Sequence, residues 1–301
     1  MLSNFITKHS LTHGFSDTVN KFYIPLAQKL AEGYLQLEKQ PKSTFFVGIN
    51  GCQGSGKSTL AEFLALYLQE QFNLSVLVLS LDDFYLDKQH RQQLAQQYHP
   101  LFNTRGVPGT HDVKLLKTVL TRLKNLNKAQ QPVAVPQFNK ALDRPYPQQN
   151  WSTVTSGVDI VLFEGWCWGV PPQREDDLTL PINNLEAQCD QQGIWRRQVN
   201  YSLQHYYQPL YAMMDTWVML KAPNFDVVYQ WRLEQEQKLA KAYLARKGES
   251  NCIMSPEQVY EFIQYFQRLT EHSFKALPDK VNILFKLDAS RDIIASRGIF
   301  S

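Results

Sequence analysis

The fold of this chain is decided by the stretch Gly51-Cys52-Gln53-Gly54-Ser55-Gly56-Lys57-Ser58. It fits the pattern G-x-x-x-x-G-K-[ST], the phosphate-binding loop (P-loop) of nucleotide-binding enzymes. The apolar run at residues 44–49 precedes it and is typical of a strand buried on both faces. Apolar residues at helical spacing follow it: Leu60, Phe63, Leu64, Tyr67 and Leu68. The sequence therefore predicts a strand, a phosphate-binding loop and a helix that begins just after Lys57.

The order of these three elements suits phosphate binding. Glycines let backbone amides turn inward around phosphate oxygens, and the helix N-terminus adds a partial positive charge. We expect Lys57 to reach the β- and γ-phosphates and the Ser58 hydroxyl to hold Mg²⁺. The bare pattern arises by chance in roughly one chain in a hundred of this length, and the flanking strand and helix lower that chance further. The predicted nucleotide-binding residues are Gly51, Cys52, Gln53, Gly54, Ser55, Gly56, Lys57, Ser58 and Thr59.

Length and composition narrow the class of protein. The 301 residues suffice for one large α/β domain or two small ones, and a hydrophobic content of 44% suits a sizeable core. The net charge is only +3 and no cluster of Lys and Arg stands out, so we expect no nucleic-acid partner. No apolar stretch reaches membrane-spanning length, and the N-terminus lacks a signal pattern. These features predict a cytoplasmic protein with no membrane partner.

The four cysteines, Cys52, Cys167, Cys189 and Cys252, are far apart and form no metal-type spacing. They are most simply free thiols in a reducing cytosol. Cys52 lies inside the P-loop and allows two interpretations, a redox-sensitive thiol or a small residue whose backbone matters more than its sulfur. We favour the second interpretation.

The rest of the chain alternates between strand-like and helix-like segments, which indicates a parallel sheet with helices on both faces. Predicted strands after the first lie at residues 75–80, 132–138, 158–163, 216–220 and 281–287. Predicted helices lie at 16–39, from 113 onward, at 229–246 and at 256–276. Two polar segments, 87–112 and 139–149, are interpreted as loops. We expect a single domain over residues 1–301, with an N-terminal helical segment at 1–43, an insertion at 171–197 and a lid-like helical region at about 229–256.

Acidic residues stand where predicted strands end, which is where ligands bind in such sheets. Asp82 and Asp83 follow the second strand, and Glu164 follows the strand at 158–163. The aspartate pair has an alternative interpretation as a helix cap or turn. A carboxylate at the end of an apolar strand is costly without a partner, and Mg²⁺ beside a P-loop is the obvious one. One carboxylate then remains to accept the proton of an attacking hydroxyl.

Three further segments, Ser80–Tyr85, Arg105–Asp112 and Phe163–Trp166, give the sequence a family resemblance. With the P-loop they resemble the group of uridine kinase, phosphoribulokinase and pantothenate kinase. Within that group, the second and third segments most resemble the D-glycerate 3-kinases of plants, fungi and their bacterial relatives. The resemblance runs from about Phe45 to Leu220 and more loosely beyond. It implies a P-loop NTPase-type kinase domain with a helical lid, which transfers a phosphate from ATP to an alcohol with the help of Mg²⁺.

The resemblance also implies roles for individual residues. By position, Asp82 is the general base and Glu164 lies near the metal, which gives Lys57, Asp82 and Glu164 as the catalytic residues. The implied metal ligands are Ser58, Asp83 and Glu164. The acceptor, D-glycerate first, is expected to contact the loops at 105–112 and 136–144. The implied substrate-binding residues are Asp83, Arg105, His111, Asp112, Lys140 and Arg144.

An acceptor carboxylate would suit Arg105, Arg144 or Lys140. The second acceptor loop departs from the family, however. The glycerate kinases tend to have Tyr-Asp-Lys-Ser followed by Gly-Asp-Arg in this loop. The loop here, Phe138-Asn139-Lys140-Ala141-Leu142-Asp143-Arg144, is shorter and lacks the first of those two aspartates. The family group therefore leaves uridine, pantothenate and phosphoribulokinase-like acceptors as alternatives.

Several residues keep two interpretations at this stage. His111 either contacts the substrate or is a hydrogen-bonded loop histidine. Trp166 and Trp168 either wall the acceptor pocket or pack in the core. The charge-rich segment near 229–247 supplies either a solvated face or a lid cation, the candidates being Arg232, Lys238, Lys241, Arg246 and Lys247.

The rival function is a nucleotide-hydrolysing switch or a binding module with the same loop. A guanine-specific switch requires Asn-Lys-x-Asp, and the segment at 139–143 has one residue too many.

Overall fold

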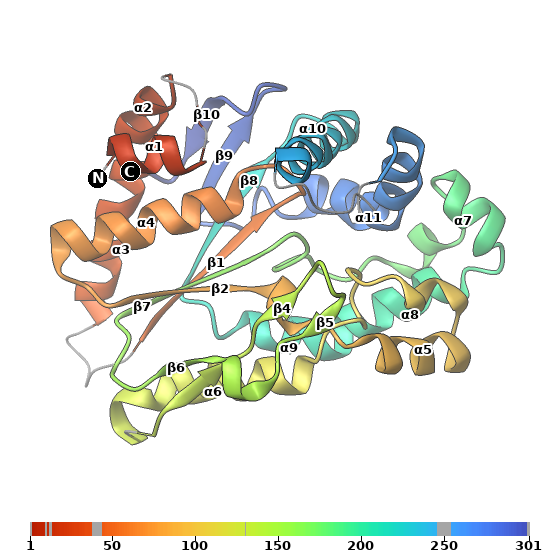
Figure 1. Cartoon of the computed structure of the whole chain (residues 1–301), viewed down its shortest axis with the longest axis horizontal. Coiled ribbons are helices and arrows are strands. Elements are labelled where there is room, and N and C mark those ends of the chain that lie inside the picture. Colours follow the sequence, from red (N-terminus) through yellow and green to blue (C-terminus); the bar gives the residue numbers. More distant parts are fainter. Residues whose placement is uncertain are drawn as a thin grey trace.

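The computed structural model describes residues 2–9, 11, 14–37, 44–129, 131–245 and 254–299, without the side chains at 127–129, 239 and 241–245. A six-stranded sheet lies at the centre of the described chain, in the order β10-β9-β8-β1-β7-β2. Its strands are β1 (Phe45–Gly51), β2 (Val76–Ser80), β7 (Ile160–Gly165), β8 (Thr216–Lys221), β9 (Ile283–Leu287) and β10 (Ile293–Arg297). Helices cover both faces of this sheet (Figure 1), as the sequence predicted.

Five strands of the sheet are parallel to their neighbours, and β10 is antiparallel to β9. The predicted parallel sheet is therefore confirmed, and β10 adds an antiparallel edge strand that was not predicted. Its direction results from a tight turn between β9 and β10, in which Arg291 N donates to Asp288 O at 3.1 Å. The β10 sequence, Ile-Ile-Ala-Ser-Arg, is partly exposed and carries little alternation, so its pattern does not reveal a strand.

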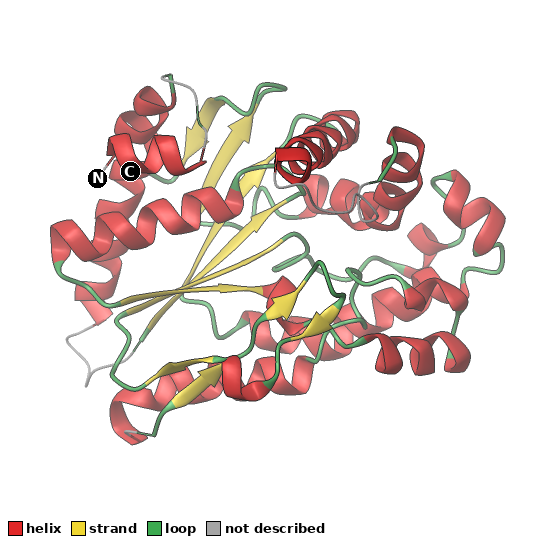
Figure 2. Cartoon of the chain, in the orientation of Figure 1, coloured by secondary structure: helices red, strands yellow, loops and turns green. Residues whose placement is uncertain are grey.

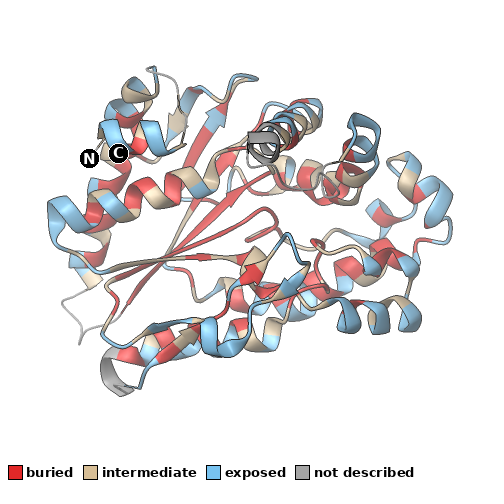
Figure 3. Cartoon of the chain, in the orientation of Figure 1, coloured by how far each residue is buried: buried red, intermediate tan, exposed pale blue. Residues whose placement is uncertain are grey.

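The P-loop strand β1 sits between β7 and β8, which come much later in the chain. All of its residues are buried, and Figure 3 shows that burial concentrates on the central strands. Successive side chains point to opposite faces. Phe45 faces α3 (Ile24–Leu37), where a Cβ on Gly33 would lie 3.1 Å from its ring, and Phe46 lies beneath Lys124 of α6 (Val113–Ala129). The P-loop therefore emerges at the middle of the carboxyl edge of the sheet, where ligands bind in such folds.

One face of the sheet is covered by α3 and by α4 (Lys57–Phe72), and the N-terminal helices lie beside them (Figure 1). The predicted helix at 16–39 is three pieces in the structure: α2 (Phe15–Thr18), a π-helical turn at Val19–Tyr23, and α3. A further helix, α1 (Leu2–His9), lies within the predicted N-terminal helical segment at 1–43, although it was not predicted as a separate helix. The end of the predicted helix, with the rest of the segment at 38–43, lies outside the described residues.

The connection between β2 and β7 is more structured than the sequence suggested. The segment interpreted as a polar loop, 87–112, contains α5 (Lys88–Gln97), and the loop interpretation of 139–149 misses a hairpin of β4 (Phe138–Asn139) and β5 (Arg144–Pro145). Among the residues of α5 only Arg91 is buried, so this helix carries no apolar periodicity to detect. A second small ladder pairs β3 (Val133–Val135) with β6 (Ser152–Val154), so the strand predicted at 132–138 is two separate strands. Figure 2 shows both ladders apart from the main sheet.

The segment at 171–197 folds against the C-terminal half of the chain. It contains α7 (Asn184–Cys189) and the start of α8 (Ile194–Ser202), which continues through a π-helical turn into α9 (Gln208–Tyr211). A buried ion pair joins Arg268 of α11 (Pro256–Ala276) to Glu186 at 2.6 Å. This pair attaches the segment to α11, next to the carboxyl edge of the sheet.

Two long helices, α10 (Phe225–Ala245) and α11, pack together beside that edge (Figure 1). The bounds of α11 are those predicted, and Ser255 closes its N-terminus with a capping box. The helix α10 begins four residues before the predicted start at Tyr229. No helix within the described ranges is long and apolar enough to cross a membrane.

Candidate active site

The P-loop backbone takes conformations that favour glycine. Gly54 and Gly56 have φ values of +76° and +88°, a region that other L-residues rarely enter. A Cβ on Gly54 would lie 2.6 Å from Cβ of Trp231 on α10, so the loop and α10 are packed as closely as a glycine allows. Gly56 directly precedes the first residue of α4, so the N-terminus of α4 opens onto the loop.

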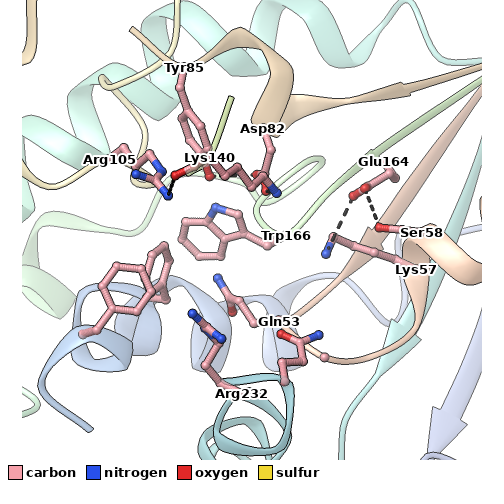
Figure 4. A pocket seen from close by; sticks show the side chains of 14 residues that line it. Gln53, Lys57, Ser58, Asp82, Tyr85, Arg105, Lys140, Glu164, Trp166 and Arg232 are labelled. Atoms are coloured by element: carbon pink, nitrogen blue, oxygen red, sulfur yellow. Dashed lines mark hydrogen bonds and ion pairs between the residues drawn. The ribbon is translucent and has the colours of Figure 1, made fainter. Parts of the chain in front are cut away.

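A cavity of about 330 Å³ opens at the carboxyl edge of the sheet, between the P-loop, the β4–β5 hairpin and helices α10 and α11. Figure 4 shows the side chains that point into it. Eight residues predicted from the sequence meet here, although they are up to 111 positions apart, between Gln53 and Glu164. The full lining is Gln53, Gly54, Lys57, Ser58, Asp82, Tyr85, Arg105, Lys140, Glu164, Trp166, Arg232, Gln235, Phe262 and Phe266.

Glu164 connects the two functional side chains of the P-loop. Ser58 Oγ donates to Glu164 Oε1 at 2.7 Å, and Lys57 Nζ lies 3.7 Å from Glu164 Oε2. Glu164 is the penultimate residue of β7, lies beside Ile49 of β1 and is 5% exposed. Oε2 accepts no hydrogen bond from the described part of the chain. A buried carboxylate next to a hydroxyl supplies the hard oxygen donors that Mg²⁺ prefers.

Asp82 faces the cavity from a 3-10 turn, Leu81–Phe84, that directly follows β2. Its Oδ2 lies 2.5 Å from Lys140 Nζ, and its Oδ1 accepts from the Tyr85 hydroxyl at 2.8 Å. Burial by itself raises the pKa of Asp82, but the charges of Lys140 and Lys57, with the two hydrogen bonds, hold it well below its usual range. The carboxyl group is therefore ionised at neutral pH and able to accept a hydrogen bond from an incoming hydroxyl.

Asp83 contacts the backbone of β4 rather than the cavity. Its Oδ1 accepts from the backbone amide of Phe138 at 3.1 Å, and it does not line the cavity. Burial, together with the negative charges of Asp82 and Glu164, raises its pKa to about 6 against the opposing effects of that amide and Lys140. The described residues contain no group of three or more His, Cys, Asp or Glu side chains able to hold a metal ion. Of the predicted metal set, the structure brings only Ser58 and Glu164 into contact.

The acceptor-loop cations are already paired. Arg105 Nη1 lies 2.5 Å from Asp143 Oδ1, and Arg105 Nη2 is 3.4 Å from the Lys140 carbonyl oxygen. The Arg105 guanidinium also lies over the Phe138 ring, 5.6 Å from its centroid. Arg144 is exposed on β5 and does not line the cavity. Arg105 and Lys140 therefore reach the cavity, and Arg144 does not.

Two further predicted substrate residues have structural contacts elsewhere. His111 is 3% exposed; its Nδ1 lies 2.6 Å from the Tyr207 hydroxyl, and its ring stacks on Tyr85 with centroids 4.7 Å apart. Burial lowers the pKa of His111 to about 4, against the charge of Asp82, so the ring is neutral at pH 7. It lines a separate cavity of about 360 Å³ behind Tyr85. Asp112 caps α6, since its Oδ1 accepts from Leu115 N at 2.9 Å.

The two tryptophans have different positions. Trp166 lines the cavity, donates its Nε1–H to Gly106 O at 3.0 Å, and packs edge-on against Phe266 of α11. Trp168 is fully buried and packs against Phe163 with centroids 4.5 Å apart. The wall interpretation therefore fits Trp166, and the core interpretation fits Trp168.

Helix α10 contributes one of the candidate lid cations named from the sequence. Arg232 lines the cavity, pairs with Glu236 at 2.7 Å, and lies over the Phe262 ring. Of its competitors, Lys238 is exposed and does not line the cavity. The side chain of Lys241, and all of Arg246 and Lys247, lie outside the described residues.

The sequence did not reveal Tyr85, Gln235, Phe262 and Phe266 as cavity residues. Phe262 and Phe266 are spaced i, i+4 on α11, and this spacing is typical of a pair that faces the core.

The P-loop cysteine is buried, and its surroundings favour the protonated thiol. Cys52 is 3% exposed, and burial raises its pKa to about 12 despite the nearby charges of Lys57 and Arg291. A thiol that stays protonated is a poor nucleophile, which supports the interpretation of Cys52 as a small backbone-supporting residue. Cys167 and Cys189 are also free thiols, and Cys252 lies outside the described residues.

The chain is similar to several kinases. "Uncharacterized kinase mug58" of Schizosaccharomyces pombe is 35% identical over 258 residues, which cover 82% of this chain and 88% of that protein. The chloroplastic D-glycerate 3-kinase of Arabidopsis thaliana is 30% identical over 227 residues, 73% of this chain but 45% of that longer protein. The solved structure of D-glycerate 3-kinase from Cryptococcus neoformans var. grubii superposes with a TM-score of 0.73 at 26% identity, covering 90% of this chain and 98% of that one. No known family model matches the chain.

Proposed function

This chain belongs to the family of P-loop kinases that includes D-glycerate 3-kinase, and from that premise we propose that it phosphorylates a hydroxyl of a small acceptor with a carboxylate, D-glycerate first. Family membership makes it an ATP-dependent phosphotransferase that acts on a small molecule. The identity of the acceptor, the general base and the metal ligands are our proposal.

One observation carries the proposal: two carboxylates, Asp82 and Glu164, and four basic side chains share a single small cavity. Lys140, which contacts Asp82, and Arg105 come from the two predicted acceptor loops, while Lys57 belongs to the P-loop and Arg232 to α10. Basic residues on both sides suit a reaction between two anions, ATP and an acidic acceptor. At about 330 Å³ the cavity suits a transferring phosphate group and a small acceptor.

The proposed mechanism assigns each charge a task. The P-loop amides and Lys57 hold the phosphates, and Arg232 lies where it can neutralise charge on the phosphoryl group in transit. The acceptor carboxylate draws Lys140 away from Asp82. The acceptor hydroxyl then attacks the γ-phosphorus, the bond from that phosphorus to the oxygen of ADP breaks, and the hydroxyl proton passes to Asp82.

Mg²⁺ fits the contact between Ser58 and Glu164. The fit rests on the buried Glu164 Oε2, which has no hydrogen-bond donor within the described chain, and on the preference of Mg²⁺ for oxygen ligands supplemented by water. We propose that Ser58 and Glu164 hold the ion, and that Asp83 contributes by orienting Asp82 and Phe138. When bound, the ion would neutralise charge on the β- and γ-phosphates.

We further propose that residues 1–301 form one kinase domain, in which α10 and α11 form the lid. Arg232, Phe262 and Phe266 of these helices line the same cavity as the P-loop. The segment at 171–197 is then an insertion that supports the lid through the Arg268–Glu186 pair.

The acceptor is tested by assaying D-glycerate, uridine and pantothenate side by side at matched concentrations with MgATP, with ADP release as the readout. We expect D-glycerate to give the highest kcat/KM. Efficient use of uridine or pantothenate without use of D-glycerate would assign the chain to a neighbouring kinase activity. ADP release that needs no acceptor would indicate the nucleotide-hydrolysing switch.

A further inference from the structure

We propose that Asp143 is a positioning residue, which holds Arg105 and the loop that carries Lys140 in place for the acceptor. Asp143 is not among the residues that line the cavity, so it acts through these two cations. The proposal rests on the proposed function, because it concerns acceptor binding in the same cavity.

The Asp143 carboxylate joins two arginines from different segments. Its Oδ1 lies 2.5 Å from Nη1 of Arg105, and its Oδ2 pairs with Nη2 of Arg91. The Asp143 side chain is about one-third exposed, whereas Arg91 is almost completely buried. Charge-assisted contacts of this kind are shorter and stronger than neutral hydrogen bonds.

Arg91 is the fixed end of this arrangement. Its Nε donates to Asn103 O at 3.1 Å and its Nη1 donates to Leu86 O at 3.0 Å. Each of its three guanidinium nitrogens therefore has a partner within the described chain. A buried charge that loses its counterion is costly, so Arg91 keeps Asp143 at one position.

The β4–β5 hairpin needs such an anchor because each of its strands has only two residues. A ladder this short is not stable on its own. Its loop carries Lys140, whose Nζ contacts Asp82. Asp143 lies at the far end of the loop with φ of +50°. The contact of Lys140 with Asp82 and that of Asp143 with Arg91 therefore hold the two ends of the loop.

Asp143 also sets the direction of Arg105. One terminal nitrogen of the guanidinium is taken by Asp143, and the other lies near the Lys140 carbonyl oxygen. An acceptor carboxylate would therefore bind an Arg105 guanidinium whose orientation is already fixed, rather than one that rotates freely. Pre-orientation of this kind lowers the entropy cost of binding and keeps the acceptor hydroxyl aligned.

The test is Asp143→Asn. Asparagine tolerates positive φ at least as well as aspartate, so the variant removes the charge without new backbone strain. With whichever acceptor the wild type phosphorylates, we expect the acceptor KM to rise about tenfold, the equivalent of one charge-assisted hydrogen bond. The kcat should also fall, whereas the ATP KM should change less than about twofold, because Asp143 does not line the cavity near the P-loop.

Two controls separate positioning from general damage. Asp279→Asn removes an exposed ion pair with Arg297 and should leave every kinetic constant unchanged. Arg105→Gln combined with Asp143→Asn should raise the acceptor KM by less than the product of the two single effects, since both variants break one contact. An unchanged acceptor KM in Asp143→Asn, or an equal rise for acceptor and ATP, would overturn the proposal.

Amide hydrogen exchange tests Asp143 independently of the proposed function. In Asp143→Asn the amides of residues 138–146 should exchange about tenfold faster, while those of β1 stay protected. If the wild type uses none of the tested acceptors, the proposed function fails and this exchange result still decides the role of Asp143. Unchanged exchange in the hairpin would contradict it.

Discussion

Replacement of Glu164 by Gln examines the contact between the P-loop and the proposed metal site. Gln keeps the size of the side chain and an acceptor for Ser58 Oγ, which lies 2.7 Å from Oε1. It removes the negative charge that lies 3.7 Å from Lys57 Nζ, in a place where the Glu164 side chain is only 6% exposed. The variant therefore isolates the charge of Glu164 from its shape.

The magnitude follows from this geometry. At 3.7 Å the Lys57–Glu164 pair is an ion pair rather than a hydrogen bond, so we take the lower part of the range for loss of a charged partner, about 1–2 kcal/mol of unfolding free energy. Domains of this size lose about 2–4 °C in melting temperature per kcal/mol. The ligand-free protein should therefore melt a few degrees lower and remain folded.

The effect on catalysis should be much larger than the effect on stability. If Glu164 holds Mg²⁺, Glu164→Gln should lower kcat by at least about 10²-fold and raise the Mg²⁺ concentration needed for half-maximal rate. The assay is ADP release against Mg²⁺ concentration at saturating ATP and acceptor. Thermal unfolding with and without MgADP provides a second readout, because the stabilisation by MgADP should shrink. A folded Glu164→Gln protein would refute the reasoning if it kept the wild-type kcat and the wild-type Mg²⁺ concentration for half-maximal rate.

Three other predictions concern single residues. Lys57→Ala should abolish phosphotransfer and leave the fold intact, because Lys57 faces the cavity; turnover at the wild-type rate would remove its proposed role. Asp82→Asn should lower kcat by roughly 10²–10⁴-fold, the usual effect of losing a positioned base, with little change in ATP affinity, whereas Asp83→Asn should lower it far less; the reverse order would make Asp83 the base. The raised pKa of Asp83, about 6, means that the folded protein binds its proton more tightly than the unfolded chain does. Ionisation of Asp83 therefore lowers the free energy of unfolding as pH rises from about 4 to 6, and causes no further change above pH 6. Asp83→Asn, which keeps an acceptor for Phe138 N, should accordingly melt higher than the wild type at pH 7 and match it near pH 4; melting curves over this range check the sign.

The sheet and the P-loop were predictable because their signals are local. The apolar residues before Gly51 form a strand that is buried on both faces. The strand, the glycine-rich loop and the helix follow one another directly in the sequence. The carboxylates Asp82 and Glu164 were located by the rule that parallel strands end at one edge. The parallel pairing of β2 with β7, in which Ser80 lies opposite Glu164, brings those two ends together.

The remaining part of the site depends on tertiary contacts that no local pattern reveals. The helix α5 is polar except for Leu94 and Ala95, and its buried residue is Arg91, which pairs with Asp143 about fifty positions later. Phe262 and Phe266 lie on the apolar face of a regular helix, and only the packing of α11 places them in the cavity. His111 was open to two interpretations because its sequence context does not show Tyr207, its hydrogen-bond partner from a distant helix.

The central claim, phosphoryl transfer to the hydroxyl of D-glycerate, is tested most directly by identifying the product. The protein is incubated with MgATP and D-glycerate, and the reaction is followed by ³¹P nuclear magnetic resonance, with Lys57→Ala as the control. We predict equal amounts of ADP and a phosphate monoester of glycerate, and neither product with the control. Inorganic phosphate as the only new phosphorus species beside ADP, or no reaction with D-glycerate while another acceptor is phosphorylated, would contradict the claim.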